Sequence, residues 1–431
     1  MDTSQVSNLE GARSAPLDIL VALNGPGEVT GWFAPFVKAL KRREPGARVT
    51  AALLPCVFAT GREERVLAES GLADEVLGVR RTLALILRGE AKPEALGGRR
   101  CLLHLGGEPL LSLLLALRTR RRAFAYAETP IAFARFFSRV FWASASLLPL
   151  PGNRGLLSGR PSRLGEENRG RVIGNLMADA VKGRSRCAGS LPGAPLTIGL
   201  FPGSREYQVR HMLQFFVKVM GDLRERAREC RALLALSPFV ELETLGRVAC
   251  DHWSHSPLEG ENSRLAPDGR HLVSDRGLRI DVLTGAEVME KADLVLAVPG
   301  TATAELAAAG VPMVVVVPTY RAEVHPLPGL WGHLGRVPFL GRFLKRAAAL
   351  MWLRHWRFTA HPNIAAGRMV VPELTGRVTA DMVGDAVLNL EGGRLAAVSE
   401  ELIRLSGPGG AADRLAEEML SAMNWKRRNA P

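Results

Sequence analysis

The chain has 431 residues, of which 47% are hydrophobic and 23% charged, and its formal net charge is +13. This length exceeds one ordinary core and predicts two domains of about 200 residues each, while the composition excludes a disordered chain. Five scattered cysteines without a CxxC pair argue against a disulfide framework or a metal cluster and predict reduced thiols.

No segment predicts insertion into or passage through a membrane. The first 25 residues contain no basic segment followed by an apolar one, so we expect no signal peptide. The most apolar stretch, 102–117, contains His104 and Glu108 and falls short of the ~18 uninterrupted apolar residues of a spanning helix. The basic excess lies among Leu, Phe and Trp without a nucleic-acid motif, which favours an anionic membrane surface over nucleic acid. The alternative is plain solvated charge that keeps the protein soluble.

The first half alternates short apolar runs with helical patterns, which predicts a parallel sheet with crossover helices. A strand over 18–23 ends in the turn NGPGE, and a helix follows over 32–44. Further strands are expected over the ranges 48–55, 101–107 and 123–128. The pattern is Rossmann-like but lacks GxGxxG, so it does not by itself predict a dinucleotide site.

The pattern restarts after a Gly-, Ser- and Pro-rich stretch. We interpret 183–195 as a linker between an N-terminal domain (16–182, preceded by a flexible tail over 1–15) and a nucleotide-binding domain (196–392). Its predicted elements are a helix over 206–228 and strands over 197–201, 232–238, 294–298 and 312–318. Helices within 393–431, broken at 407–410, are expected to cross back to the first domain.

The run PGTATAE (299–305) has the form of an anion site. Gly300 allows close approach of the backbone to a ligand, and the amides of Thr301 to Thr303 open a helix whose first turn favours a phosphate. Glu305, one turn further, is placed to accept the hydroxyls of a ribose. The alternative is an ordinary connection with a Thr cap and a Glu that complements the helix dipole.

A second loop of this form, PGSR (202–205), combines Gly203 and Ser204 with Arg205. A guanidinium in the first helical turn can bind a phosphate in bidentate fashion, although Arg205 could instead be a plain surface residue. Both loops follow parallel strands, so they are expected to converge on one crevice. Together they predict a site for a nucleotide diphosphate.

Six motifs resemble the lipid-A-disaccharide synthases, a family of GT-B glycosyltransferases. They occur in family order over most of the chain, and they are GPGEVTGW, VIGNLMAD, LFPGSRE, ADLVLAVPGTATAEL, GVPMVVVVP and HPNIAAGRMVVPEL. The resemblance implies two Rossmann-like domains facing across a cleft, no cofactor or metal, and inversion at the sugar. It also implies that a UDP-sugar is bound by residues from both domains: Glu28, Gly203, Ser204, Arg205, Gly300, Thr301, Thr303, Glu305, Asn363 and Glu373.

The acceptor side departs from the family. Where the family's acidic loop supplies a base, this chain has HLGGEPLLSL, with Gly107 and Leu110 in place of aspartates. Glu108 is the nearest carboxylate and His104 the nearest imidazole, and either could act as the base. Trp32 replaces an acidic residue, and Asn175 replaces a histidine.

Two basic, aromatic segments predict contact with lipid. In 118–151, arginines alternate with Phe and Trp at helical spacing, although the segment could equally be core strand and helix with a basic rim. In 325–358, six basic residues and three tryptophans occur without an acidic residue. The alternatives for the latter are a buried hairpin or a homodimer contact. The expected location is cytoplasmic, at the inner face of the membrane.

The leading hypothesis is transfer of a sugar, of the N-acetylhexosamine type, from UDP to a lipid-linked acceptor. A UDP-N-acetylglucosamine 2-epimerase would use the same cleft but would need no lipid-facing surface. A non-catalytic, membrane-associated protein that binds a UDP-sugar would account for the lost aspartates. Products distinguish the three: a glycolipid with free UDP, an epimerised UDP-sugar, or neither.

Overall fold

The computed structural model describes residues 16–56, 59–89, 99–144, 170–181, 195–226, 229–251, 258–319, 357–391 and 394–428. Most of the predicted linker and nearly all of the basic segment 325–358 lie outside these residues, as does the tail 1–15. None of the helices within the described ranges is long and apolar enough to cross a bilayer.

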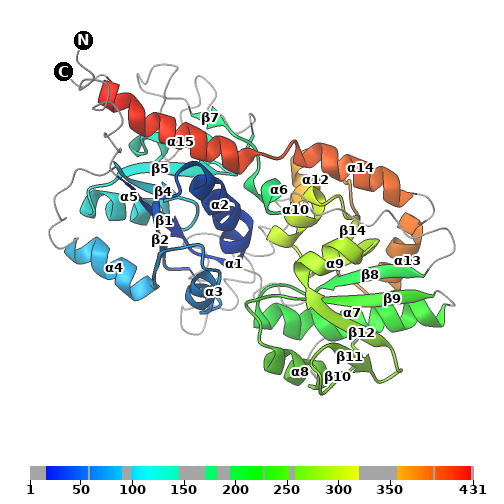
Figure 1. The fold of residues 1–431 in the computed structure, drawn as a ribbon. Coiled ribbons are helices and arrows are strands. Elements are labelled where there is room, and N and C mark those ends of the chain that lie inside the picture. The colour runs from blue at the N-terminus through cyan, green and yellow to red at the C-terminus, as the bar shows by residue number, and fades with distance from the viewer. Residues whose placement is uncertain are drawn as a thin grey trace, which may run out of the picture.

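The N-terminal half is built on a parallel sheet of order β3-β2-β1-β4-β5-β6-β7 (Figure 1). Its strands are β1 (Leu17–Leu23), β2 (Arg48–Leu53), β3 (Glu75–Leu77), β4 (Arg99–His104), β5 (Arg122–Ala127), β6 (Arg139–Trp142) and β7 (Arg171–Val172). Its helices are α1 (Pro26–Glu28), the π-helix η1 (Val29–Phe33), α2 (Ala34–Arg43), α3 (Glu63–Glu69), α4 (Val79–Arg88), α5 (Pro109–Arg118), the 3₁₀-helix η2 (Ala134–Phe136) and α6 (Leu176–Ala180).

The C-terminal half holds a second sheet of order β10-β11-β12-β9-β8-β13-β14-β15, parallel except for the pairings of β11 with β10 and β12. Its strands are β8 (Leu196–Phe201), β9 (Cys230–Leu236), β10 (Ser263–Leu265), β11 (His271–Ser274), β12 (Arg279–Thr284), β13 (Leu294–Ala297), β14 (Met313–Pro318) and β15 (Glu373–Gly376). Its helices are α7 (Glu206–Glu225), α8 (Leu242–Cys250), α9 (Gly285–Lys291), α10 (Thr301–Ala308), α12 (His361–Ala366), α13 (Ala380–Glu391), α14 (Arg394–Ser406) and α15 (Ala411–Arg428).

Each expected strand is present, because continuous runs of Val, Leu and Ile fill strands that are buried on both faces. Two expectations need correction. Helical turns begin at Pro26, inside the turn NGPGE, rather than near Trp32. The helical interpretation of 118–151 is wrong over its described part, where β5 and β6 run side by side with Tyr126 opposite Phe141.

The last helix returns to the N-terminal half (Figure 1). Its apolar face joins the core of β1 and α2 through Leu415 and Met419. The Asp179 carboxylate accepts hydrogen bonds from the amides of Gly410 and Ala412 at the start of α15, where a carboxylate is most stabilising.

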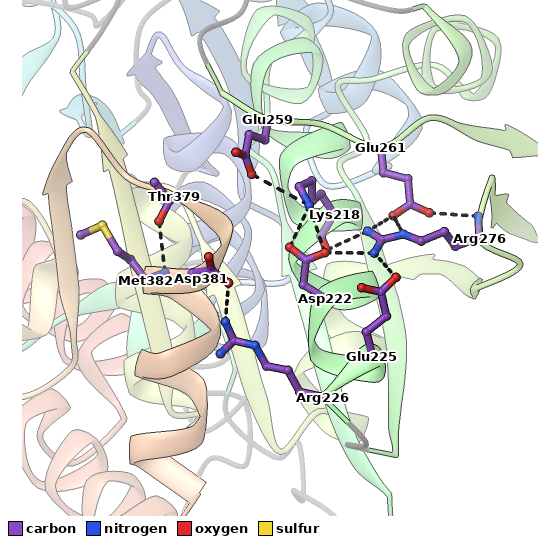
Figure 2. Close-up of polar contacts among 10 residues, drawn as sticks. All are labelled: Lys218, Asp222, Glu225, Arg226, Glu259, Glu261, Arg276, Thr379, Asp381 and Met382. Carbon is purple, nitrogen blue, oxygen red and sulfur yellow. Dashed lines mark hydrogen bonds and ion pairs between the residues drawn. The ribbon is translucent and has the colours of Figure 1, made fainter.

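In the C-terminal half, an ion-pair network fastens the β11–β12 turn to α7. Figure 2 shows the Arg276 guanidinium between carboxylates of α7 and Glu261, while Arg226 reaches Asp381 on α13. The carboxylates around Arg276 hold its pKa above the ordinary value, and the hydrogen bond to Glu261 is the largest cause, followed by those to Glu225 and Asp222. The network joins elements of one domain and lies apart from the residues of the interdomain cleft described below.

Candidate active site

A cleft of about 1630 Å³ lies between the two halves. Its lining includes the loops that follow β1, β4, β8 and β13. In each sheet these strands flank the point where the strand order reverses, which is where open α/β sheets bind ligands. Sheet topology therefore brings all four glycine-containing loops to one place.

The loop after β8 leads into the 20-residue helix α7. Gly203 has φ +118°, which an L side chain rarely adopts, and Arg205 is the extended residue before the helix. The Ser204 amide donates to Gln208 Oε1 at 3.1 Å. The residues 203–205 and Gln208 all line the cleft.

The loop after β13 presents a second helix start. Gly300, with φ +152°, precedes α10, and Thr301 and Glu305 line the cleft. Thr303 is fully buried instead. Its hydroxyl donates to the Gly300 carbonyl at 2.8 Å and accepts from the His361 amide at 3.1 Å. Thr303 therefore holds the loop in place from the protein interior.

Asn363 and Glu373, which the resemblance places near the donor, are not among the residues that line the cleft. Asn363 is buried and its Oδ1 accepts from the amides of Val370 and Val371 at 2.7 and 3.0 Å. The Glu373 carboxylate accepts from the Thr359 amide and from Asn363 Nδ2. Both residues hold in place the segment that packs against α10. The motif spacing could not distinguish this structural role from contact with a ligand.

Glu28 lines the N-terminal side of the same cleft as the loops after β8 and β13. Its Oε2 accepts the amides of Asn24 at 2.6 Å and Gly25 at 3.2 Å. Gly106 lies directly against the carboxylate, where a Cβ would come within 2.0 Å of Glu28 Cδ. Burial raises the pKa of Glu28 to about 7, although the two amide hydrogen bonds oppose the shift.

The two halves contact each other beside this carboxylate. A Cβ on Gly27 would lie 2.3 Å from Thr301 Cγ2, so only glycine permits this approach. The Thr30 hydroxyl lies 3.5 Å from Glu305 Oε1. An ion pair of 2.5 Å between Arg62 and Glu241 spans the halves at another point. Glu28 therefore lies close to the start of α10.

The two residues considered as a base have different surroundings. Glu108 is exposed, precedes α5 and lines the cleft. His104 is buried, with Nδ1 2.8 Å from Ser112 Oγ, and does not line the cleft. Burial lowers the His104 pKa to about 4, so the ring stays neutral at pH 7.

Sequence reasoning missed a second carboxylate with a raised pKa, Glu128. Burial raises its pKa to about 7, and the Tyr126 hydroxyl, which donates to it at 2.8 Å, opposes that shift. Trp32, in the cleft lining, packs edge-on against Tyr126. The sequence feature that could have indicated Glu128 is its position directly after β5, at the same edge of the sheet as the loops after β1 and β4.

Solved structures share this architecture. A UDP-N-acetylglucosamine 2-epimerase aligns with 96% of this chain and 98% of its own, with 14% identity and a TM-score of 0.51. MnaA from S. aureus, solved with UDP, aligns over 95% and 97% of the two chains, with 16% identity and a TM-score of 0.53. The fold is therefore GT-B, with two Rossmann-like domains facing across a cleft.

Curated relatives define the resemblance more narrowly, although no protein-family model matches the chain. The lipid-A-disaccharide synthase of Geobacter sulfurreducens is 28% identical over 58% of this chain and 56% of its own. That of Anaeromyxobacter dehalogenans is 29% identical over 55% and 52%, and that of Rhodopseudomonas palustris is 34% identical over 30% and 26%. The chain spans about half the length of the first and second of these relatives and about a quarter of the third. Over the aligned part it is similar to the lipid-A-disaccharide synthases, at 28–29% identity for the first and second of these relatives.

Proposed function

We propose that this protein is a glycosyltransferase that moves a sugar from a UDP-sugar to a lipid-linked acceptor. The observation that carries the proposal is the convergence, in one cleft, of two helix starts and Arg205 opposite the Glu28 carboxylate. Helix N-termini and a guanidinium suit a diphosphate, and a carboxylate with a pKa near 7 suits proton transfer.

The donor diphosphate is assigned to the space between Ser204–Arg205 and Gly300–Thr301. Charge develops on the diphosphate as the glycosidic bond breaks, and donors already aimed at it stabilise that charge without reorganisation. Glu305, which lines the cleft four residues after Thr301, is assigned to the ribose hydroxyls. The structure of MnaA with UDP, which has the same fold, supports a UDP-sugar as the donor.

We assign the general base to Glu28 in preference to Glu108. A base must be ionised at the working pH yet hold a proton well enough to remove it from a hydroxyl, which a pKa near 7 achieves. The two amides that bind Oε2 orient the carboxylate, and Gly27 brings its loop against Thr301 at the donor site. Attack from the face opposite the diphosphate would invert the anomeric carbon.

Epimerisation is the second candidate, because Glu28 and Glu128 both have raised pKa values and could act as paired acid and base. Epimerisation would need both carboxylates at the sugar, but Glu128 does not line the cleft, whereas Glu28 and Trp32 do. This arrangement favours transfer over epimerisation.

Product analysis tests the proposal. The protein is incubated with labelled UDP-N-acetylhexosamines and a total lipid extract, and both the lipid and the nucleotide fractions are analysed. We expect free UDP together with a labelled lipid. A UDP-sugar epimer without labelled lipid would establish the second candidate, and an intact donor with measurable UDP affinity would identify a binding protein.

A further inference from the structure

The loop that follows β9 contributes to the hydrophobic cores of both halves. Phe239 is 4% exposed and joins the core of the N-terminal half, whose other described members lie within 17–176 or on α15. The next residue, Val240, is 6% exposed and joins the core of the C-terminal half instead. A tight turn holds both, because the Val240 amide donates to the Ser237 carbonyl at 3.0 Å and the Phe239 amide donates to the Ser237 hydroxyl at 3.3 Å. The Phe239 side chain therefore crosses from one half into the other.

An ion pair joins the two halves at the end of the same loop. The Glu241 carboxylate lies 2.5 Å from the Arg62 guanidinium, and the two side chains are 46% and 30% exposed. The turn before Arg62 is held by the buried Glu63 carboxylate, which accepts the Thr60 amide at 2.7 Å and the Thr60 hydroxyl at 2.9 Å. An exposed pair contributes little energy by itself. The buried Phe239 ring is therefore the main attachment, and the ion pair adds a second contact beside it.

These contacts and the contact at Gly27 lie on either side of the loop that follows β8. In the C-terminal sheet β8 lies between β9 and β13. The loop after β9 carries Phe239, and the loop after β13 carries Thr301, which the Gly27 backbone approaches. In the N-terminal sheet the matching segments follow the neighbouring strands β2 and β1. The two halves are thus joined at two points that flank the loop after β8.

We propose that these contacts form an interdomain latch, made of Phe239, Arg62 and Glu241. The latch positions the Glu28 carboxylate relative to the loop after β8. One contact, at Gly27, would let the halves rotate about it, whereas two contacts fix their relative orientation. Arg62 and Glu241 do not line the cleft, so the ion pair acts through the position of the halves and not by touching a substrate. The three are positioning residues, and their effect on turnover rests on the proposed function.

Truncation of the buried ring tests the latch in the full chain. Phe239→Ala removes the contact with the N-terminal core, and Phe239→Leu keeps an apolar side chain there. Val240→Ala is the matched control, because it truncates the next residue of the same loop but alters the core of the C-terminal half. Small-angle X-ray scattering measures the radius of gyration, and calorimetry measures UDP affinity. Steady-state kinetics with a UDP-N-acetylhexosamine and the total lipid extract measures kcat as UDP release.

Phe239→Ala should have a larger radius of gyration than wild type, and its kcat should fall by about 10²-fold, the cost of a 1 Å misplacement. Its UDP affinity should stay within about twofold, because the donor loops keep their places in the C-terminal half. Val240→Ala should keep the wild-type radius and kcat, and Phe239→Leu should recover most of the lost kcat. Equal radius and equal kcat in Phe239→Ala and Val240→Ala would overturn the proposal.

Charge reversal tests the exposed ion pair without disturbing either core. Arg62→Glu and Glu241→Arg should each lower kcat by up to about fivefold, the effect of roughly 1 kcal/mol for a surface pair. The double variant, which restores the pair with its charges exchanged, should recover kcat. Arg81→Glu breaks a pair with Glu75 inside the N-terminal half and should leave kcat unchanged. A double variant as slow as the single ones would remove the ion pair from the latch.

The scattering result separates the latch from the proposed function. A larger radius of gyration in Phe239→Ala, together with absence of turnover in wild type, would support the latch and refute the transferase. An unchanged radius in that variant, together with normal wild-type turnover, would refute the latch and leave the transferase intact.

Discussion

Glu28 in the cleft and Glu261 behind α7 are carboxylates in opposite electrostatic surroundings. Glu261 is buried against the Arg276 guanidinium, which also contacts the carboxylates of Asp222 and Glu225 on α7 (Figure 2). Glu28 has two backbone amides, and the described residues place no cation in an ion pair with it. A carboxylate paired with a guanidinium holds structure together, whereas one desolvated without a cation is ready to take up a proton.

The largest effect is expected from Glu28→Gln. The amide keeps the size and one oxygen for the Asn24 and Gly25 amides but cannot accept a proton, so kcat should fall roughly 10²–10⁴-fold. UDP affinity should stay nearly constant, because Glu28 is assigned to the acceptor and not to the diphosphate. Steady-state kinetics and calorimetry measure the two quantities.

Glu108→Gln is the matched control for this variant, since Glu108 also lines the cleft. If Glu108→Gln abolishes turnover and Glu28→Gln retains it, the base is Glu108 and the contrast between Glu28 and Glu261 loses its functional meaning. His104→Ala should retain catalysis at temperatures where the variant is folded.

Arg276→Ala should have the opposite profile. It leaves Glu261 buried without its cation and should lower the free energy of unfolding by about 2–4 kcal/mol, with kcat unchanged. Arg279→Ala, which removes an exposed pair with Asp281, should cost less than about 1 kcal/mol. Denaturant unfolding of both variants checks the difference, and similar losses would show that the Arg276 network contributes little.

Arg205→Ala and Glu305→Ala separate donor binding from the proton chemistry of Glu28. Each should weaken UDP binding by roughly 1.5–3 kcal/mol, the range for hydrogen bonds to charged groups. Arg224→Ala, an exposed arginine at the far end of the same helix α7, is the control. Unchanged UDP affinity in both cleft variants would remove the donor-site assignment.

The sequence predicted the sheets and the convergence of the two C-terminal glycine loops, because buried strands and glycine turns depend on local patterns. The sequence could not distinguish residues that contact a ligand from residues that hold the loops in place. Thr303 occurs in the same motif as Thr301 and Asn363 in another of the six motifs, yet the side chains of both point into the protein and bind backbone groups. The pKa of Glu28 depends on burial by Gly106 and neighbouring segments far away in sequence, which no local pattern encodes.

A separate prediction concerns the pH dependence of stability. Glu28 titrates near 7 in the folded protein and near 4.5 when unfolded, so the folded state binds the extra proton between these values. Stability from this group is therefore present below pH 4.5 and is lost as pH rises through 7. Between pH 5 and pH 8 the Tm of Glu28→Gln should fall less than the Tm of wild type. An identical fall in the two proteins would place the pKa of Glu28 in its ordinary range.

The most direct test of the central claim is the structure of the protein with UDP bound. The account predicts the diphosphate between Ser204–Arg205 and Gly300–Thr301, with the Arg205 guanidinium and the first amides of α10 within hydrogen-bond distance of its oxygens and the ribose at Glu305. UDP bound elsewhere, or bound in the cleft without contact to either loop, would contradict it.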